Sequence, residues 1–160
     1  FNNWHIHNHP LGDVIFSDQD IRNYEYYGVR GGLVITKDGT EYELINMDPV
    51  SKVKEAEELK HEFLYGDMTE KEYTEKMNEL LPFSSEASSN FERIETEWRD
   101  ERREKLDQLY GQYGRENREM VNKMYDQWKE SVGDDNARKA KWLEDNAEKY
   151  GFVFGKRKVK

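Results

Sequence analysis

Residues 5–20 read HIHNHPLGDVIFSDQD, a stretch that predicts a strand, a loop and the start of a helix. Its histidines stand at alternate positions, so on a strand they point to one side of the sheet. Seven residues lie between His9 and Ser17, and Asp20 follows three positions after Ser17. The imidazoles of His7 and His9 and the carboxylate of Asp20 form a three-ligand set for zinc. Such a set leaves a fourth position open for water, as a catalytic zinc requires.

The local pattern around this stretch supports the same element order. Residues 3–9 alternate as a strand. Ser17, with an acid three positions later, is a capping box, so a helix is expected to begin there and to end at about Tyr27, before Gly28. A capping box by itself also explains Ser17 and Asp20 without any metal. The histidines at this spacing favour the metal site.

The pattern His-x-His, seven residues, Ser-x-x-Asp resembles the JAMM motif of the MPN/JAB-domain zinc metalloproteases and isopeptidases. His7, His9, Ser17 and Asp20 occupy its four positions. The run His-Asn-His-Pro looks most like the bacterial and phage branch of the family, which includes RadC-like proteins, and the resemblance covers residues 3–46. It implies that His7, His9 and Asp20 bind Zn²⁺. It also implies that Ser17 is catalytic, with its hydroxyl facing the carbonyl of a protein or peptide substrate.

One residue of the family pattern has no counterpart in the sequence. The family has a glutamate on an earlier strand that takes a proton from the zinc-bound water, whereas residues 1–4 read FNNW. The first residue is Phe rather than Met, which favours a fragment of a longer protein; otherwise the glutamate comes from elsewhere or catalysis is lost. Glu41 and Glu43 are the only acids on a predicted neighbouring strand. His5 is expected to be structural or to support the site from outside the metal set.

A hairpin and then a helical region are predicted after Gly28. Residues 31–36 and 41–45 read as strands around an Asp-Gly turn. From residue 48 the pattern becomes helical. Ser51 is expected to cap a helix that ends at about residue 65, and Thr69 opens a second helix, to Leu81, through a capping box.

A long charged helix with a narrow apolar stripe is predicted beyond the Ser-rich segment 82–90, which reads as a linker. The stripe recurs at helical spacing through Phe91, Ile94, Trp98, Leu106, Leu109, Tyr113, Met120, Met124 and Trp128. Gly111 and Gly114 are expected to break the helix in two, and polar residues make the stripe an imperfect coiled-coil seam. A last helix is predicted over 136–150. Residues 151–155 form an extended piece that packs on its own helices or adds a strand to a neighbour's sheet.

Composition and charge restrict the class of protein. The chain has 160 residues, 37% of them charged and 35% hydrophobic, and a mean hydropathy of −1.14, which is typical of long solvated helices. Its net charge of −9 disfavours nucleic-acid binding outside the basic tail Lys156, Arg157, Lys158 and Lys160. That tail is a solvated terminus or a contact for phosphate or an acidic partner. No apolar run reaches the roughly 20 residues of a membrane span, and with no cysteine there is no disulfide or thiolate metal site.

Together these features predict an α+β protein. Residues 1–47 are expected to form a partial MPN/JAB-like strand–helix–hairpin unit, and residues 48–160 a helical region with a coiled-coil-like hairpin and a basic tail. The resemblance implies a zinc-dependent peptidase or isopeptidase domain, incomplete or inactive without the upstream glutamate. A second interpretation is a non-catalytic minor capsid or head-morphogenesis protein of a phage particle, whose partners are other phage structural proteins. A third is a toxin or effector domain.

Overall fold

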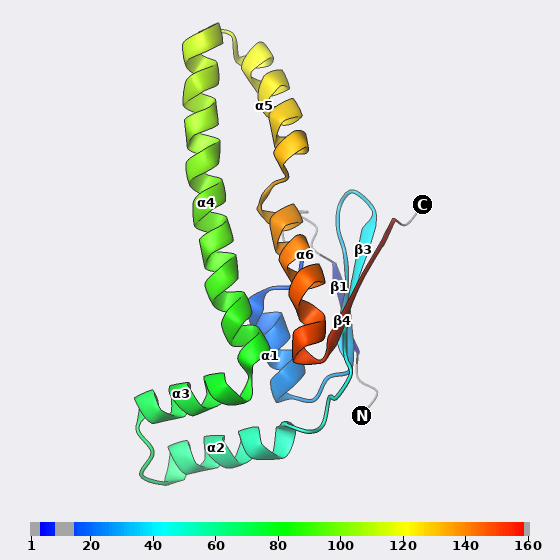
Figure 1. Ribbon diagram of the computed structural model, residues 1–160, viewed down its shortest axis with the longest axis vertical. Coiled ribbons are helices and arrows are strands. Elements are labelled where there is room, and N and C mark those ends of the chain that lie inside the picture. Colours follow the sequence, from blue (N-terminus) through cyan, green and yellow to red (C-terminus); the bar gives the residue numbers. More distant parts are fainter. Residues whose placement is uncertain (1–3, 9–14, 159–160) are drawn as a thin grey trace.

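The computed structural model describes residues 4–8 and 15–158, with the backbone alone for residues 5–8. It confirms an α+β fold with a long helical extension: helices cover one face of a sheet, and two of them continue beyond it as an arm (Figure 1). In chain order the elements are β1 (Trp4–Asn8), α1 (Asp18–Tyr26), β2 (Gly31–Ile35), β3 (Thr40–Asn46), α2 (Val53–Tyr65), α3 (Glu70–Leu80), α4 (Pro82–Tyr113), α5 (Arg118–Val132), α6 (Asp135–Asn146), the 3-10 helix η1 (Ala147–Tyr150) and β4 (Phe152–Lys158).

The sheet has the strand order β1-β2-β3-β4. β1 runs parallel to β2, and α1 makes the crossover that a parallel pair requires. β2 and β3 form the expected hairpin. Its turn is closed by the Asp38 carboxylate, which accepts a hydrogen bond from the Thr40 backbone N–H at 3.0 Å, and by Gly39 at φ 81°.

β4 completes the sheet from the far end of the chain. It pairs antiparallel with β3, from Thr40 opposite Lys158 to Asn46 opposite Phe152. The extended piece predicted after Gly151 therefore adds a strand to its own sheet. The prediction of a merely solvated tail was wrong for the backbone of residues 156–158, because β-ladder bonds fix it. Their side chains stay exposed, and the Arg157 guanidinium binds the Glu41 carboxylate at 2.6 Å.

A single buried core lies between the sheet and the helices. This core contains residues from both sides of residue 48, where the helical region was predicted to begin. Its side chains include Ile21 and Tyr24 of α1, Val34 and Leu44 of the sheet, Phe83, Ala87, Phe91 and Ile94 of α4, Leu143 of α6 and Phe152 of β4. Helices from the second half of the chain thus bury the sheet of the first half.

The predicted linker over residues 82–90 was wrong, because this segment is the start of α4. Pro82 occupies the first helical turn, where its missing N–H costs nothing. Leu81, at the N-cap, supplies no side-chain acceptor. Instead the buried Glu25 carboxylate of α1 accepts a hydrogen bond from the Ser84 backbone N–H at 3.0 Å. A residue distant in sequence therefore caps this helix.

Other helix boundaries follow local signals only in part. Thr69 caps α3 as expected, its hydroxyl oxygen accepting from the Glu72 N–H at 3.1 Å. Ser51 does not cap α2, which begins at Val53 without a side-chain cap. Gly111 does not break α4, which continues through it and ends at Gly114, where φ is 85°.

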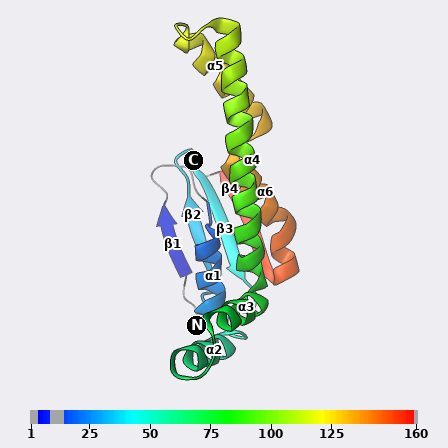
Figure 2. The same ribbon diagram turned by 90° about the vertical axis from the view of Figure 1, so that its left-hand side faces the viewer.

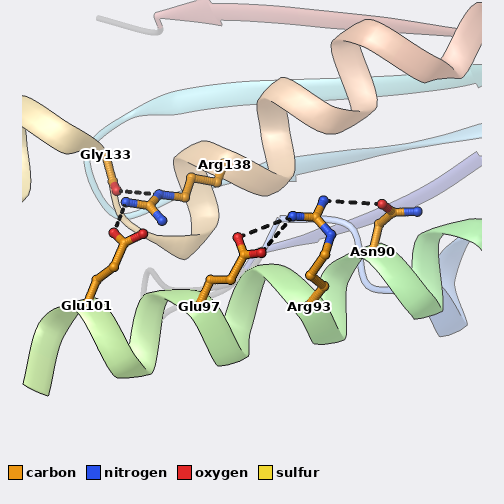
Figure 3. A network of polar contacts seen from close by, with 6 residues as sticks. All are labelled: Asn90, Arg93, Glu97, Glu101, Gly133 and Arg138. Carbon is orange, nitrogen blue, oxygen red and sulfur yellow. Dashed lines mark hydrogen bonds and ion pairs between the residues drawn. The ribbon is translucent and has the colours of Figure 1, made fainter.

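The arm consists of the outer part of α4 and the antiparallel α5. The Trp98 and Trp128 rings stack between the two helices with centroids 5.4 Å apart. The Arg138 guanidinium of α6 also lies over the Trp98 ring, 5.2 Å from its centroid. Arg138 also donates to Glu101 at 2.6 Å and to the Gly133 carbonyl at 3.1 Å, so it ties three helices together at the base of the arm (Figure 3). None of the helices in the described ranges is long and apolar enough to cross a membrane.

Candidate functional site

The candidate site lies at the first turn of α1. β1 and β2 run in the same direction, and α1, which connects them in the sequence, packs on one face of the sheet (Figure 2). A crossover helix runs back along its strands, so its first turn lies at the carboxyl end of β1. In parallel β-α-β units this end of the sheet is where ligands bind.

Ser17 and Asp20 hold this turn in a reciprocal capping box. The Ser17 hydroxyl oxygen accepts from the Asp20 N–H at 3.0 Å, and Asp20 Oδ2 accepts from the Ser17 N–H at 3.0 Å. Both side chains are half-buried. The Ser17 O–H remains a donor, because the capping bond uses only a lone pair of the oxygen. The turn therefore presents a hydroxyl and a carboxylate in fixed orientation.

The expected zinc ligands are only partly within the described residues. Asp20 is described in full, His7 only by its backbone near the end of β1, and His9, like Asp13, lies outside the described residues. Within the described part of the chain, no group of three or more His, Asp or Glu side chains is placed to hold a metal. The described half fits zinc in its chemistry: an oriented carboxylate at the carboxyl end of the strand that carries His7.

Two buried aromatic side chains, Phe16 and Tyr24, lie next to this turn in the sequence and in the core. Phe16 and Tyr24 are fully buried, and their rings meet edge to face at 6.1 Å. Burial, and secondly the negative charge of Asp20, raise the pKa of the Tyr24 phenol above its ordinary value. Tyr24 is thus a core residue. Sequence reasoning missed its position beside Asp20, for which the spacing of four residues on one helix was the available signal.

Glu41 and Glu43 are not brought to this turn. Side chains alternate along β3, and Leu44 points into the core that α1 covers. The two glutamates therefore lie on the opposite face of the sheet, where Glu41 pairs with Arg157. Neither acid is in a position to exchange a proton with a group held by Asp20.

The fourth histidine of the sequence, His61, is a surface residue. His61 lies on α2, exposed, with its ring 5.0 Å from the Tyr65 ring. His61 is therefore not part of the candidate site on α1. In comparisons with known proteins, no family model, curated protein or solved structure matches this chain.

Proposed function

We propose that the first turn of α1 is part of a JAMM-type zinc peptidase or isopeptidase site, in which His7, His9 and Asp20 hold Zn²⁺. The observation that carries the proposal is the β1–α1–β2 unit. It supports a shared site because the carboxyl end of β1 and the first turn of α1 lie at one end of the sheet. When bound, zinc supplies Lewis-acid activation of water and of a substrate carbonyl.

The residues of the turn have separable roles in this proposal. Ser17 donates its hydroxyl proton in a hydrogen bond to the carbonyl oxygen of the scissile amide, an interaction worth about 3 kcal/mol at such sites. Asp20 acts as a ligand through a carboxylate whose orientation the Ser17 N–H fixes. One accepted hydrogen bond does not exhaust the acceptor capacity of a carboxylate, so capping and metal binding are compatible.

Zinc binding is the first test. The metal-stripped chain, reloaded with zinc and desalted, should retain about one zinc per molecule by elemental analysis. His9→Ala should abolish retention and Asp20→Asn should weaken it. His61→Ala and Asp18→Asn are matched controls, since they remove an exposed imidazole and a neighbouring carboxylate of the same helical turn. Equal zinc retention by His9→Ala and the unaltered chain, both folded by circular dichroism, would contradict the site.

Catalytic activity is a separate test, because it depends on a general acid–base glutamate for which these residues offer no candidate. The leaving amine must be protonated, and general acid–base help is worth about 10²–10⁴-fold. Zinc-loaded chain should therefore cleave peptide or isopeptide bonds very slowly or not at all. Adding an upstream segment should restore cleavage only if it brings a strand glutamate to the zinc. Rapid, chelator-sensitive cleavage by these residues alone would show that another base serves the site.

A structural role is the second candidate, and the arm of α4 and α5 favours it. The arm extends past the sheet (Figure 1), and its outer part carries partly exposed apolar side chains such as Met120. In this proposal the sheet unit is a scaffold and the chain binds structural proteins of a phage particle. Zinc retention without cleavage, even in a longer protein that supplies a strand glutamate, would favour this candidate.

A further inference from the structure

A surface groove lies between α1, α2 and α3, and Gln19 of the first turn of α1 is among its lining residues. It has a volume of about 430 Å³, within the usual range for ligand sites. We call it the tyrosine groove, and its principal lining residues are Arg22, Tyr26, Tyr27, Lys60, Tyr73 and Asn78. Asp20, the expected zinc ligand whose side chain the structure describes, does not line it.

The groove has an unusual charge for this chain. No Asp or Glu is among the described residues that line it, although the chain carries 34 acids and 25 Lys or Arg. Three other grooves of the described surface each combine cations with carboxylates. In the described part of the chain, no carboxylate lies within ion-pair distance of Arg22 or Lys60. A groove whose described lining holds cations and no carboxylates is complementary in charge to an anionic ligand.

Arg22 is held in position for such a ligand. Its Nη2 donates to the Asn78 side-chain oxygen of α3 at 2.8 Å, and the side chain is half-buried. This bond uses one of the five guanidinium N–H groups, so donors remain for a planar, two-pronged anion such as a carboxylate. Fixing the side chain in advance reduces the entropy lost on binding.

The other lining residues suit a peptide. Tyr27 is 62% exposed and meets Tyr26 edge to face at 4.7 Å, which leaves aromatic surface for an apolar side chain. The Gln19 side-chain N–H donates to the Asn23 side-chain oxygen at 3.0 Å, so the Gln19 carbonyl oxygen still offers an acceptor and the Asn23 NH₂ group still offers donors. Amide groups of this kind match the N–H and C=O of a main chain. The net charge of −9 disfavours nucleic acids and other polyanions.

We propose that the tyrosine groove binds a peptide segment of a partner protein, with a Glu or Asp side chain on Arg22 and Lys60 and a neighbouring apolar side chain against Tyr26 and Tyr27. The proposal goes beyond the zinc site and does not depend on it. It assigns the chain a protein-binding surface of defined chemistry, for a partner that presents an acidic residue next to an aromatic or aliphatic one.

The test is a nuclear magnetic resonance titration of the full chain. The probe is an equimolar mixture of acetyl-Gly-Xaa-Glu-Xaa-Gly-amide peptides, with Xaa Phe, Leu or Tyr, against the same mixture with Gln in place of Glu. The Glu mixture should shift the resonances of groove residues, and the Gln mixture should bind about tenfold more weakly or worse, since a charge-assisted contact is lost. Phosphotyrosine amide is a third probe.

Two substitutions in the groove and one outside it sharpen the result. Arg22→Gln should weaken binding of the Glu mixture about tenfold. Asn78→Asp should do the same, because it gives Arg22 a carboxylate partner within the chain. Arg30→Gln, which removes an exposed cation outside the groove, should leave binding unchanged. Equal binding of the two mixtures, shifts confined to other surfaces, or tighter binding of phosphotyrosine at the groove would overturn the proposal.

Discussion

Glu25 shows how a single buried side chain joins two parts of the chain. Its carboxylate is 3% exposed, accepts the Ser84 N–H and lies 3.5 Å from the Lys52 ammonium. A buried carboxylate that accepts one backbone hydrogen bond and one long contact from a partly exposed cation is a compromise between desolvation and attraction. Desolvation dominates, and it raises the pKa of Glu25 above its ordinary value of 4.5.

The raised pKa predicts how stability depends on pH. The folded state holds the Glu25 proton more tightly than the unfolded state does. The stability linked to this proton is therefore fully present below pH 4.5 and is lost as pH rises through the folded pKa. We expect the unfolding free energy of the unaltered chain to fall, relative to that of Glu25→Gln, as pH increases across this range. Chemical denaturation of both proteins at several pH values measures this. A difference independent of pH would contradict it.

Removing the acceptor altogether should cost more than removing the charge. Glu25→Ala leaves the buried Ser84 N–H without its partner, for an expected loss of about 1–3 kcal/mol, whereas Glu25→Gln keeps an acceptor. Glu86→Ala, an exposed acid near the start of α4, is the matched control and should change stability little.

At the scale of elements, the arm depends on the seam between α4 and α5. Leu109 is 2% exposed there. Leu109→Asp buries an unpaired carboxylate and removes apolar contact, so it should lower the unfolding free energy by at least about 3 kcal/mol. Leu64→Asp on α2, where the leucine is 56% exposed, should cost about 0.5 kcal/mol or less. Urea unfolding followed by circular dichroism measures both. Equal losses would mean that the seam does not stabilise α4 and α5.

Elements whose signals are local could be predicted from the sequence. The capping box at Ser17, the N-cap at Thr69 and the Asp-Gly turn act within four residues, and all three are confirmed. At Thr69 the hydroxyl accepts from the Glu72 N–H, but the reciprocal bond of a full capping box is not formed. The start of α4 could not be predicted, since its serines resemble a linker until Glu25 and the core pack against them. The prediction for Gly111 was wrong for a related reason. A glycine inside a helix costs about 1 kcal/mol relative to alanine, and the helical residues on both sides of Gly111 outweigh that cost.

The candidate sites divide in the same way. Ser17 and Asp20 are three residues apart, so sequence reasoning could pair them. The tyrosine groove joins Arg22 to Asn78, 56 positions away, across three helices. The residue pattern of a single helix cannot indicate such a groove, because its lining depends on which faces of three helices pack together.

At the scale of the whole molecule, β4 should be as important to stability as any internal strand. Phe152 is 2% exposed and packs 4.8 Å from the Phe83 ring, between sheet and helices. Phe152→Ala should cost about 3–5 kcal/mol. Val153→Ala is the control on the other face of the same strand, where the valine is 47% exposed, and should cost less than about 1 kcal/mol. Similar losses for the two variants, measured by thermal unfolding, would show that β4 adds little to the core.

The pairing of β3 with β4 also has a consequence for biosynthesis. Asn46 and Phe152 are neighbours in the sheet, yet more than a hundred residues of chain must be translated between them. At about 5–20 residues per second, the nascent sheet waits roughly 5–20 s with the β3 edge unpaired and its core face without the later helices that complete the core. Unpaired edges and exposed apolar side chains are what chaperones bind and what drives aggregation. The timing of translation, and not only the final free energy, therefore influences how much of this protein reaches its native state.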